Sequence, residues 1–156
     1  FLWMDFSGNK TEVLPINTLP SLKVLISSKP GRSSGAVHAP IMERWSRGDP
    51  QIKRVMDAYR PLVEQGRVAL LAGDIPTLAE CMDQNFELRA SLFSIHEEDQ
   101  AMISLCRRHG SAAKLCGSGG AVLALMKSKE EWSALEVEAK GAGITVIEPQ
   151  LFKEVS

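Results

Sequence analysis

A short run of small residues between two apolar segments constrains the fold more than any other feature: "GSGG", residues 117–120, within "AKLCGSGGAVLALM". Three glycines in four positions supply the positive φ angles that a tight connection between antiparallel strands needs. The segment therefore predicts a β-hairpin. The same glycines leave backbone N–H groups unshielded, and successive N–H groups in such a loop can form a concave anion site. From the pattern alone, a plain turn and a ligand-binding loop both stay open.

Helical spacing of apolar residues dominates the chain before this hairpin. We expect helices over residues 35–47, 50–72 and 98–109, and another that Asp74 caps at its start. Pro61 should kink or split the second of these helices, because proline lacks an N–H group and clashes with the preceding turn.

Apolar and β-branched residues predict strands on both sides of this helical region. The segments are "FLWMDF", "TEVLPI" and "SLKVLISS" before it and "ITVIE" near the end, with a helix around Trp132 preceding "ITVIE". Without the extra helices, the order is strand, helices, strand, strand, helix, strand, which is the split βαβ arrangement of a ferredoxin-like α+β sandwich. We expect one antiparallel sheet with helices packed on one face and with extra helices inserted.

The composition is that of an ordinary globular domain and argues against several functional classes. The 156 residues carry a net charge of −1, with no basic stripe, which argues against a nucleic-acid partner. No apolar run approaches the roughly 20 residues of a membrane span, so no membrane partner is expected. The three cysteines lack C-x-x-C spacing. They predict neither a disulfide framework nor a zinc site, which favours a cytoplasmic protein with reduced thiols.

The wider segment "HGSAAKLCGSGGAVLALM" resembles the third motif of the GHMP kinase family, approximately G-A-x-G-A-K-x-T-G-A-G-x-G-G. The positions that align with this motif are Ala113, Lys114, Gly117, Gly119 and Gly120. Two positions depart from it, because Cys116 stands where the family usually has threonine and Ala121 where many members have another glycine. Other stretches, including "GAVHAPIMERWSRGD" and "MDQNFELR", are similar to glucuronokinase-type sugar kinases, so the resemblance covers essentially the whole chain.

The resemblance implies that residues 1–156 form a single domain, the C-terminal domain of a two-domain kinase. Such a kinase transfers the γ-phosphate of ATP to a hydroxyl group of a small molecule, here a sugar or sugar acid. ATP and Mg²⁺ are the implied cofactors, held mainly by an N-terminal domain that is missing from this chain. That domain and a small-molecule substrate are the implied partners.

The start of the chain and a missing motif support the expectation of a fragment. The chain opens at Phe1 directly on an apolar strand pattern, as if it began within a larger protein. It contains no P-x-x-x-G-L-x-S-S loop, which cradles the nucleotide in the family, and the family's catalytic aspartate would also lie upstream. We therefore expect no catalytic residue and no metal ligand in this chain, and no activity from it alone.

The resemblance and the unshielded backbone of the glycine loop point to one phosphate- or substrate-binding site. Its residues are Gly117, Ser118, Gly119 and Gly120, with Lys114 as a further candidate. A solvated strand residue is the alternative for Lys114, because exposure is the ordinary state of a lysine. Arg32, in "KPGRSSG", could grip the carboxylate of a sugar acid through two parallel hydrogen bonds, or it could be an ordinary surface arginine.

Two alternatives to a sugar-acid kinase stay open. The chain could come from a mevalonate-type or galactose-type GHMP kinase. It could also be a non-catalytic ligand-binding module of ferredoxin-like fold, since a fold does not determine a function. An upstream P-x-x-x-G-L-x-S-S loop in the natural reading frame would exclude the ligand-binding module.

Overall fold

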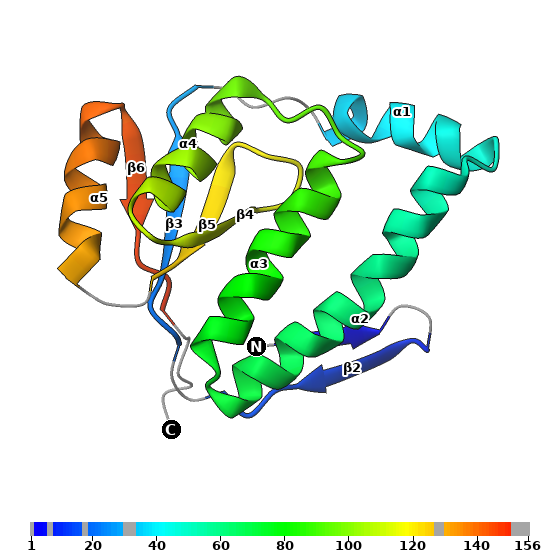
Figure 1. Cartoon of the computed structure of the whole chain (residues 1–156), viewed down its shortest axis with the longest axis horizontal. Coiled ribbons are helices and arrows are strands. Elements are labelled where there is room, and N and C mark those ends of the chain that lie inside the picture. The colour runs from blue at the N-terminus through cyan, green and yellow to red at the C-terminus, as the bar shows by residue number, and fades with distance from the viewer. Residues whose placement is uncertain (1, 6–7, 17–18, 30–33, 127–129, 151–156) are drawn as a thin grey trace.

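A computed structural model describes residues 2–5, 8–16, 19–29, 34–126 and 130–150 of the chain (Figure 1). The elements in chain order are β1 (Leu2–Asp5), β2 (Lys10–Val13), β3 (Leu22–Ser27), α1 (Ser34–Ser46), α2 (Pro50–Ala72), α3 (Ile75–Ala90), α4 (Glu97–Arg108), β4 (Ala112–Leu115), β5 (Ala121–Leu125), α5 (Glu130–Gly141) and β6 (Ile144–Ile147). Among the helices of the described residues, none combines the length and the apolar composition that crossing a membrane requires.

Four strands form an antiparallel sheet in the order β4-β5-β3-β6. Leu25 of the central strand β3 pairs with Val122 of β5 on one side and with Val146 of β6 on the other. In sequence, β3 is the first strand of this sheet and β6 is the last, yet the two are neighbours in it. This is the strand order of the split βαβ sandwich. The predicted fold class is therefore confirmed.

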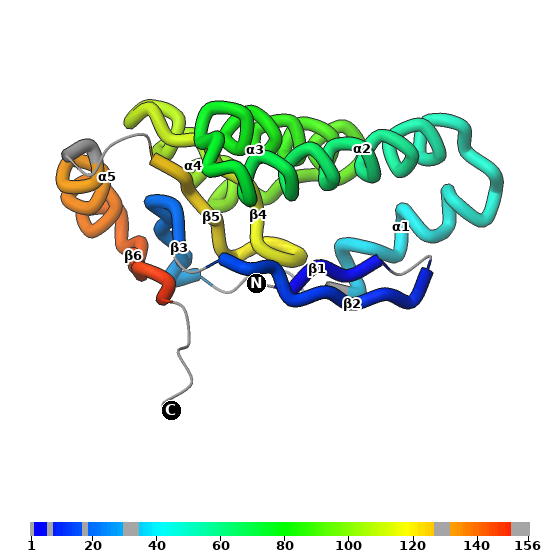
Figure 2. The backbone as a smooth tube through the Cα atoms, turned by 90° about the horizontal axis from the view of Figure 1, so that it is seen from below, coloured from blue at the N-terminus to red at the C-terminus, as the bar shows by residue number. Residues whose placement is uncertain are grey.

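The first two strands stand apart from this sheet. Within the part of the chain that the structure describes, β1 and β2 pair only with each other, as a separate two-stranded sheet. Figure 2 shows this hairpin on the far side of the molecule from α3 and α4. Trp3 of β1 lies beneath α2, with the guanidinium of Arg67 5.3 Å from the centre of its ring. The pattern of "FLWMDF" predicted a strand but contained no information on which sheet it would join.

The main core lies between the four-stranded sheet and the helices α4 and α5. Its fully buried side chains include Leu25 and Val122 from the sheet, Ile103 from α4 and Leu135 from α5. Burial of these apolar side chains is the main favourable term in folding. It also fixes the position of α4 beneath the connection between β4 and β5, and this connection contains the glycine loop.

Helix α2 is one unbroken helix through Pro61, so the predicted split is wrong. Asp49 caps the start of α2 by accepting a hydrogen bond from the backbone of Gln51, and Gly73 ends it in the left-handed conformation, with φ 69°. Ile52 and Leu62 are buried along the helix. Tertiary packing of this kind supplies most of a helix's stability and here overrides the local effect of proline.

Replacing Pro61 with alanine should raise the free energy of unfolding by about 2 kcal/mol, because Pro61 lies inside the helix and is exposed. Alanine restores the missing backbone hydrogen bond without removing a buried contact. Pro50→Ala is the matched control, because Pro50 occupies the first turn of the same helix, where a missing N–H costs little. Urea unfolding of both variants tests this, and equal stability changes for the two would contradict it.

Candidate functional site

The glycine loop connects β4 and β5 as a hairpin, and this part of the prediction is confirmed. Leu115 pairs with Val122, and the backbone N–H of Cys116 donates to the carbonyl oxygen of Ala121 at 2.9 Å. Gly117, Gly119 and Gly120 have φ angles of 56°, 125° and 81°. These angles favour glycine because a Cβ atom is strained there.

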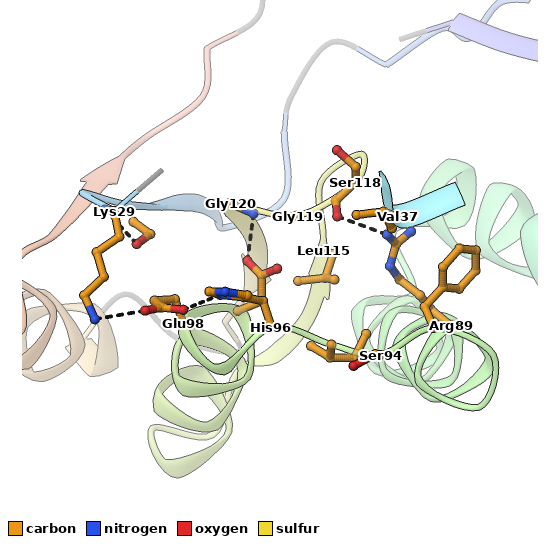
Figure 3. Close-up of a pocket in the computed structure, with 14 residues that line it drawn as sticks. Lys29, Val37, Arg89, Ser94, His96, Glu98, Leu115, Ser118, Gly119 and Gly120 are labelled. Carbon is orange, nitrogen blue, oxygen red and sulfur yellow. Dashed lines mark hydrogen bonds and ion pairs between the residues drawn. The ribbon is translucent and has the colours of Figure 1, made fainter. Parts of the chain in front are cut away.

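The carboxylate of Asp99 lies directly beneath the loop. Asp99 belongs to the first turn of α4, and only 6% of its surface is exposed. One of its oxygens, Oδ1, accepts a hydrogen bond from the backbone N–H of Gly120 at 2.7 Å (Figure 3). A Cβ atom at position 119 would overlap Oδ2 and lie 3.2 Å from Cγ of Asp99. The carboxylate and the backbone angle therefore both require glycine at position 119.

Sequence reasoning missed Asp99, although a signal for it was present. Three acids begin α4, and such acids are usually explained by the helix dipole alone. Asp99 precedes buried Met102 by three positions and buried Cys106 by seven, and Glu98 has a similar spacing to Met102 and Leu105. That spacing places an acid on the apolar face of the helix. A carboxylate in that position needs a hydrogen-bond donor, and the loop supplies it.

Arg89, from the last turn of α3, contacts the loop from another side. Its Nη2 donates to the carbonyl oxygen of Ser118 at 3.2 Å (Figure 3). Its guanidinium carbon lies 4.8 Å from the centre of the Phe93 ring. The loop is thus held by a carboxylate on one of its N–H groups and by a guanidinium on one of its carbonyl groups. Arg89 was also missed from the sequence, since nothing local connects it to residues 117–120.

The four backbone N–H groups of the loop divide into two pairs. Gly119 donates to the carbonyl oxygen of Cys116 at 3.3 Å, and Gly120 donates to Asp99. The N–H groups of Gly117 and Ser118 have no acceptor among the residues that the structure describes. Loop residues predicted to bind phosphate are therefore together in one place, and two of their N–H groups are available to a ligand. Their role in binding stays a prediction.

A small cavity opens between the loop, the end of α3 and the start of α4. It is lined by Arg89, His96, Asp99, Leu115 and Ser118, among others. Its volume is about 20 Å³, which is room for about one water molecule. A sugar or a nucleotide does not fit inside it, so a substrate would have to bind at the outer rim of the loop.

The outer edge of this cavity carries a row of paired charges. The ammonium group of Lys29 lies 2.9 Å from a carboxylate oxygen of Glu98, and His96 contacts the other oxygen of the same carboxylate. The pKa of Glu98 is held below its ordinary value, chiefly because Lys29 donates a hydrogen bond to its carboxylate. Lys29 and Glu98 neutralise each other. Arg89 and Asp99 are the charged residues that contact the loop itself.

Lys114 lies on the strand β4 that enters the loop, but it is not a solvated residue. It is half-buried, and its Nζ donates to the carbonyl oxygen of Leu115 at 3.1 Å. Burial lowers the pKa of Lys114 below its ordinary value of 10.5, and the guanidinium of Arg89 acts in the same direction. Leu115 lines the cavity, and successive residues of a strand point to opposite faces, so Lys114 points away from the cavity.

The neighbouring Cys116, which replaces the usual threonine, is also half-buried, and burial raises the pKa of its thiol. It therefore stays protonated and cannot act as a thiolate at neutral pH. Arg32, the other predicted substrate residue, lies outside the described residues, and its role stays a prediction.

Replacing Lys114 with methionine should stabilise the protein at neutral pH, because methionine fills similar space without a buried charge. The pKa of Lys114 is lower in the folded state than its ordinary value of 10.5 in the unfolded state. As the pH rises toward 10.5, the folded state therefore loses this proton first, and the natural protein becomes more stable. The advantage of K114M over the natural protein should therefore shrink as the pH approaches 10.5. Urea unfolding at a series of pH values measures this difference, and a difference that does not change with pH would refute the explanation.

Comparison with known proteins agrees with the family resemblance that the glycine motif indicates. Residues 67–143 match the family model described as "GHMP kinases C terminal". The chain is 36% identical to "Probable glucuronokinase 2" of Arabidopsis thaliana, over 94% of this chain and 43% of that protein. It is 34% identical to "Glucuronokinase 1" of the same plant, over 92% of this chain and 42% of that protein. The chain thus spans less than half the length of these curated relatives.

Solved structures share the fold. Mevalonate kinase of L. major, in complex with R-mevalonate, superimposes with a TM-score of 0.77 at 24% identity, over 95% of this chain and 48% of that one. The Lin0012 protein of Listeria innocua gives a TM-score of 0.80 at 20% identity, over 89% of this chain and 41% of that one. At these identities, the likeness concerns the fold alone. The family model and the glucuronokinases confirm the resemblance: residues 67–143 match the GHMP kinase C-terminal model, within a chain that is similar to glucuronokinases over nearly its full length.

Proposed function

We propose that residues 1–156 form the C-terminal domain of an ATP-dependent kinase that transfers the γ-phosphate of ATP to a hydroxyl group of a sugar or sugar acid. Glucuronate is the first acceptor to test, because the curated relatives at 34% and 36% identity are glucuronokinases. The observation that carries the proposal is the glycine loop, in which the N–H groups of Gly117 and Ser118 have no acceptor among the described residues.

The loop is suited to stabilise phosphate charge. Phosphoryl transfer depends on positioning and on the neutralisation of charge on the phosphate oxygens. The N–H groups of Gly117 and Ser118 would donate to these oxygens, and the hydroxyl group of Ser118 adds a further donor. Because Asp99 and Arg89 hold the loop before a ligand arrives, little reorganisation would be needed in the transition state.

ATP would supply the transferred phosphoryl group, and Mg²⁺ would neutralise its charge. Within the described residues, no group of three or more His, Cys, Asp or Glu side chains could hold a metal ion. As the family resemblance implies, Mg²⁺ would be bound by the phosphates of ATP and by the N-terminal domain. We assign the catalytic base to that domain as well, and so expect this chain alone to be inactive.

The N-terminal domain is the proposed partner of this chain, and a small-molecule acceptor is the proposed substrate. Relatives more than twice as long as the matched segment support a missing domain. We place the kinase in the cytoplasm, because all three cysteines are free thiols, as expected in a reducing compartment.

ADP release tests the proposal directly. The full-length natural protein is incubated with Mg-ATP and, separately, with glucuronate, galactose, mevalonate or homoserine, and residues 1–156 alone serve as the inactive control. Turnover with glucuronate supports the proposal. Turnover with mevalonate or homoserine only would overturn the sugar assignment and keep the kinase. A folded protein that neither binds ATP nor releases ADP would overturn the kinase and favour a ligand-binding module.

A further inference from the structure

Arg89 differs from the other arginines that the structure describes. Most of these form an ion pair with a carboxylate, as do Arg44, Arg47, Arg60, Arg67, Arg107 and Arg108. Arg54 has no such partner, but it is exposed, so water solvates its charge. Arg89 is partly buried and has no carboxylate within ion-pair distance among the described residues.

The groups that contact the guanidinium of Arg89 directly are neutral. Its hydrogen bond goes to the carbonyl oxygen of Ser118, and one face lies against the Phe93 ring. Its Nε is buried and has no hydrogen-bond partner within the part of the chain that the structure describes. Arg89 lies close enough to Lys114 to lower the pKa of Lys114. The ammonium group of Lys114 donates to a backbone carbonyl group. Asp99 is the nearest acid of the loop, but it accepts from Gly120 and forms no ion pair with Arg89. Among the described residues, Arg89 and Lys114 therefore lie near the loop without a carboxylate that pairs with either.

A partly buried cation without a counter-ion is costly, because it loses hydration and gains no charge partner in return. Its cost would be offset if a ligand brought the missing negative charge. Arg89 contacts the loop through Ser118, whose own N–H is available, so an anion at the rim of the loop would lie near both groups. Guanidinium groups also match the planar geometry of carboxylate and phosphate oxygens.

We propose that Arg89 is a binding residue for an oxyanion of the substrate, either the carboxylate of a sugar acid or a phosphate of the nucleotide. This inference rests on the proposed kinase function and adds to it a residue that binds one of the two substrates. In the competing explanation, Arg89 binds no ligand and only positions residues 117–120, through the hydrogen bond from its Nη2 to Ser118.

Arg89→Gln separates these two explanations, because glutamine keeps an N–H donor for Ser118 but loses the charge. Arg89→Lys keeps the charge without the planar fork. Arg54→Gln is the matched control, since it removes an exposed arginine that has no ion pair among the described residues. Circular dichroism and urea unfolding establish that each full-length variant is folded.

The first readout is steady-state kinetics of the full-length protein, with glucuronate and Mg-ATP varied separately. If Arg89 binds the acceptor, R89Q should raise the KM for glucuronate about 10- to 100-fold, which is the usual effect of losing a hydrogen bond to a charged group. The KM for Mg-ATP should then stay unchanged, and R89K should lie between R89Q and the natural protein. If Arg89 binds a phosphate, the KM for Mg-ATP should rise instead. A fall in kcat with both KM values unchanged would overturn the proposal in favour of loop positioning.

The second readout does not depend on turnover, so it distinguishes this proposal from the function on which it rests. Titration calorimetry measures the binding of glucuronate, ATP and inorganic phosphate to the natural protein and to R89Q. We expect at least one of these anions to bind R89Q about 10-fold more weakly, and the loss should diminish at high salt. Equal affinities of both proteins for all three anions would overturn the proposal, whether or not the protein releases ADP.

Discussion

Gly119→Ala should lower the free energy of unfolding by about 3 kcal/mol and greatly reduce phosphoryl transfer. The added Cβ would overlap the carboxylate of Asp99, at a φ angle of 125° that alanine rarely adopts. Asp99 cannot easily move away, because it is buried in the first turn of α4 and bonded to Gly120. Urea unfolding measures the stability change, and ADP release by the full-length protein measures the activity.

Gly117→Ala is the control for this substitution. Gly117 also has a positive φ angle, 56°, but a Cβ atom there meets nothing within 4 Å. We expect it to cost about 1 kcal/mol, from backbone strain alone. Combining Asp99→Ala with Gly119→Ala should cost less than the sum of the two single substitutions, because the steric conflict disappears. Equal costs at the two glycines, or strictly additive effects of G119A and D99A, would contradict a conflict between position 119 and Asp99.

Asp99→Ala should lower the free energy of unfolding by about 2 kcal/mol, because it leaves the N–H of Gly120 without its acceptor. Loss of this bond should also displace the loop and reduce the rate of phosphoryl transfer about 100-fold. Hydrogen exchange of the Gly120 amide gives the local readout, and its protection should fall about 30-fold, in proportion to the lost stability. Asp99→Asn is the matched variant, because an asparagine oxygen can still accept from Gly120. If D99N and D99A behave alike, the hydrogen bond is not what positions the loop.

Local sequence patterns were sufficient to predict the sheet and the hairpin. Strand periodicity, the order of the elements and three glycines between two apolar runs led to the observed connection between β4 and β5. Pro61 shows the limit of such patterns, since a rule that holds for an isolated helix was overridden by the packing of α2. The pairing of β1 with β2 apart from the main sheet has the same kind of cause, because partner choice depends on the whole fold.

The site was harder to predict than the fold, because its parts lie far apart in sequence. Asp99 is 21 residues from Gly120, and Arg89 is 29 residues from Ser118. From the motif alone, all of its glycines would be assigned to ligand binding. Here Gly119 is required by an internal carboxylate, and Gly120 donates to the same carboxylate. Among the described residues, the N–H groups of Gly117 and Ser118 have no acceptor, so these two are available to a phosphate.

Amide NMR of the ¹⁵N-labelled full-length protein, with and without a non-hydrolysable Mg-ATP analogue, tests phosphate binding at the loop most directly. We predict that the Gly117 and Ser118 N–H signals move downfield and exchange more slowly with the analogue bound. Gly119 and Gly120 should change little, because their N–H groups stay on Cys116 and Asp99. Saturating binding of the analogue that leaves Gly117 and Ser118 unchanged would contradict phosphate binding by this loop.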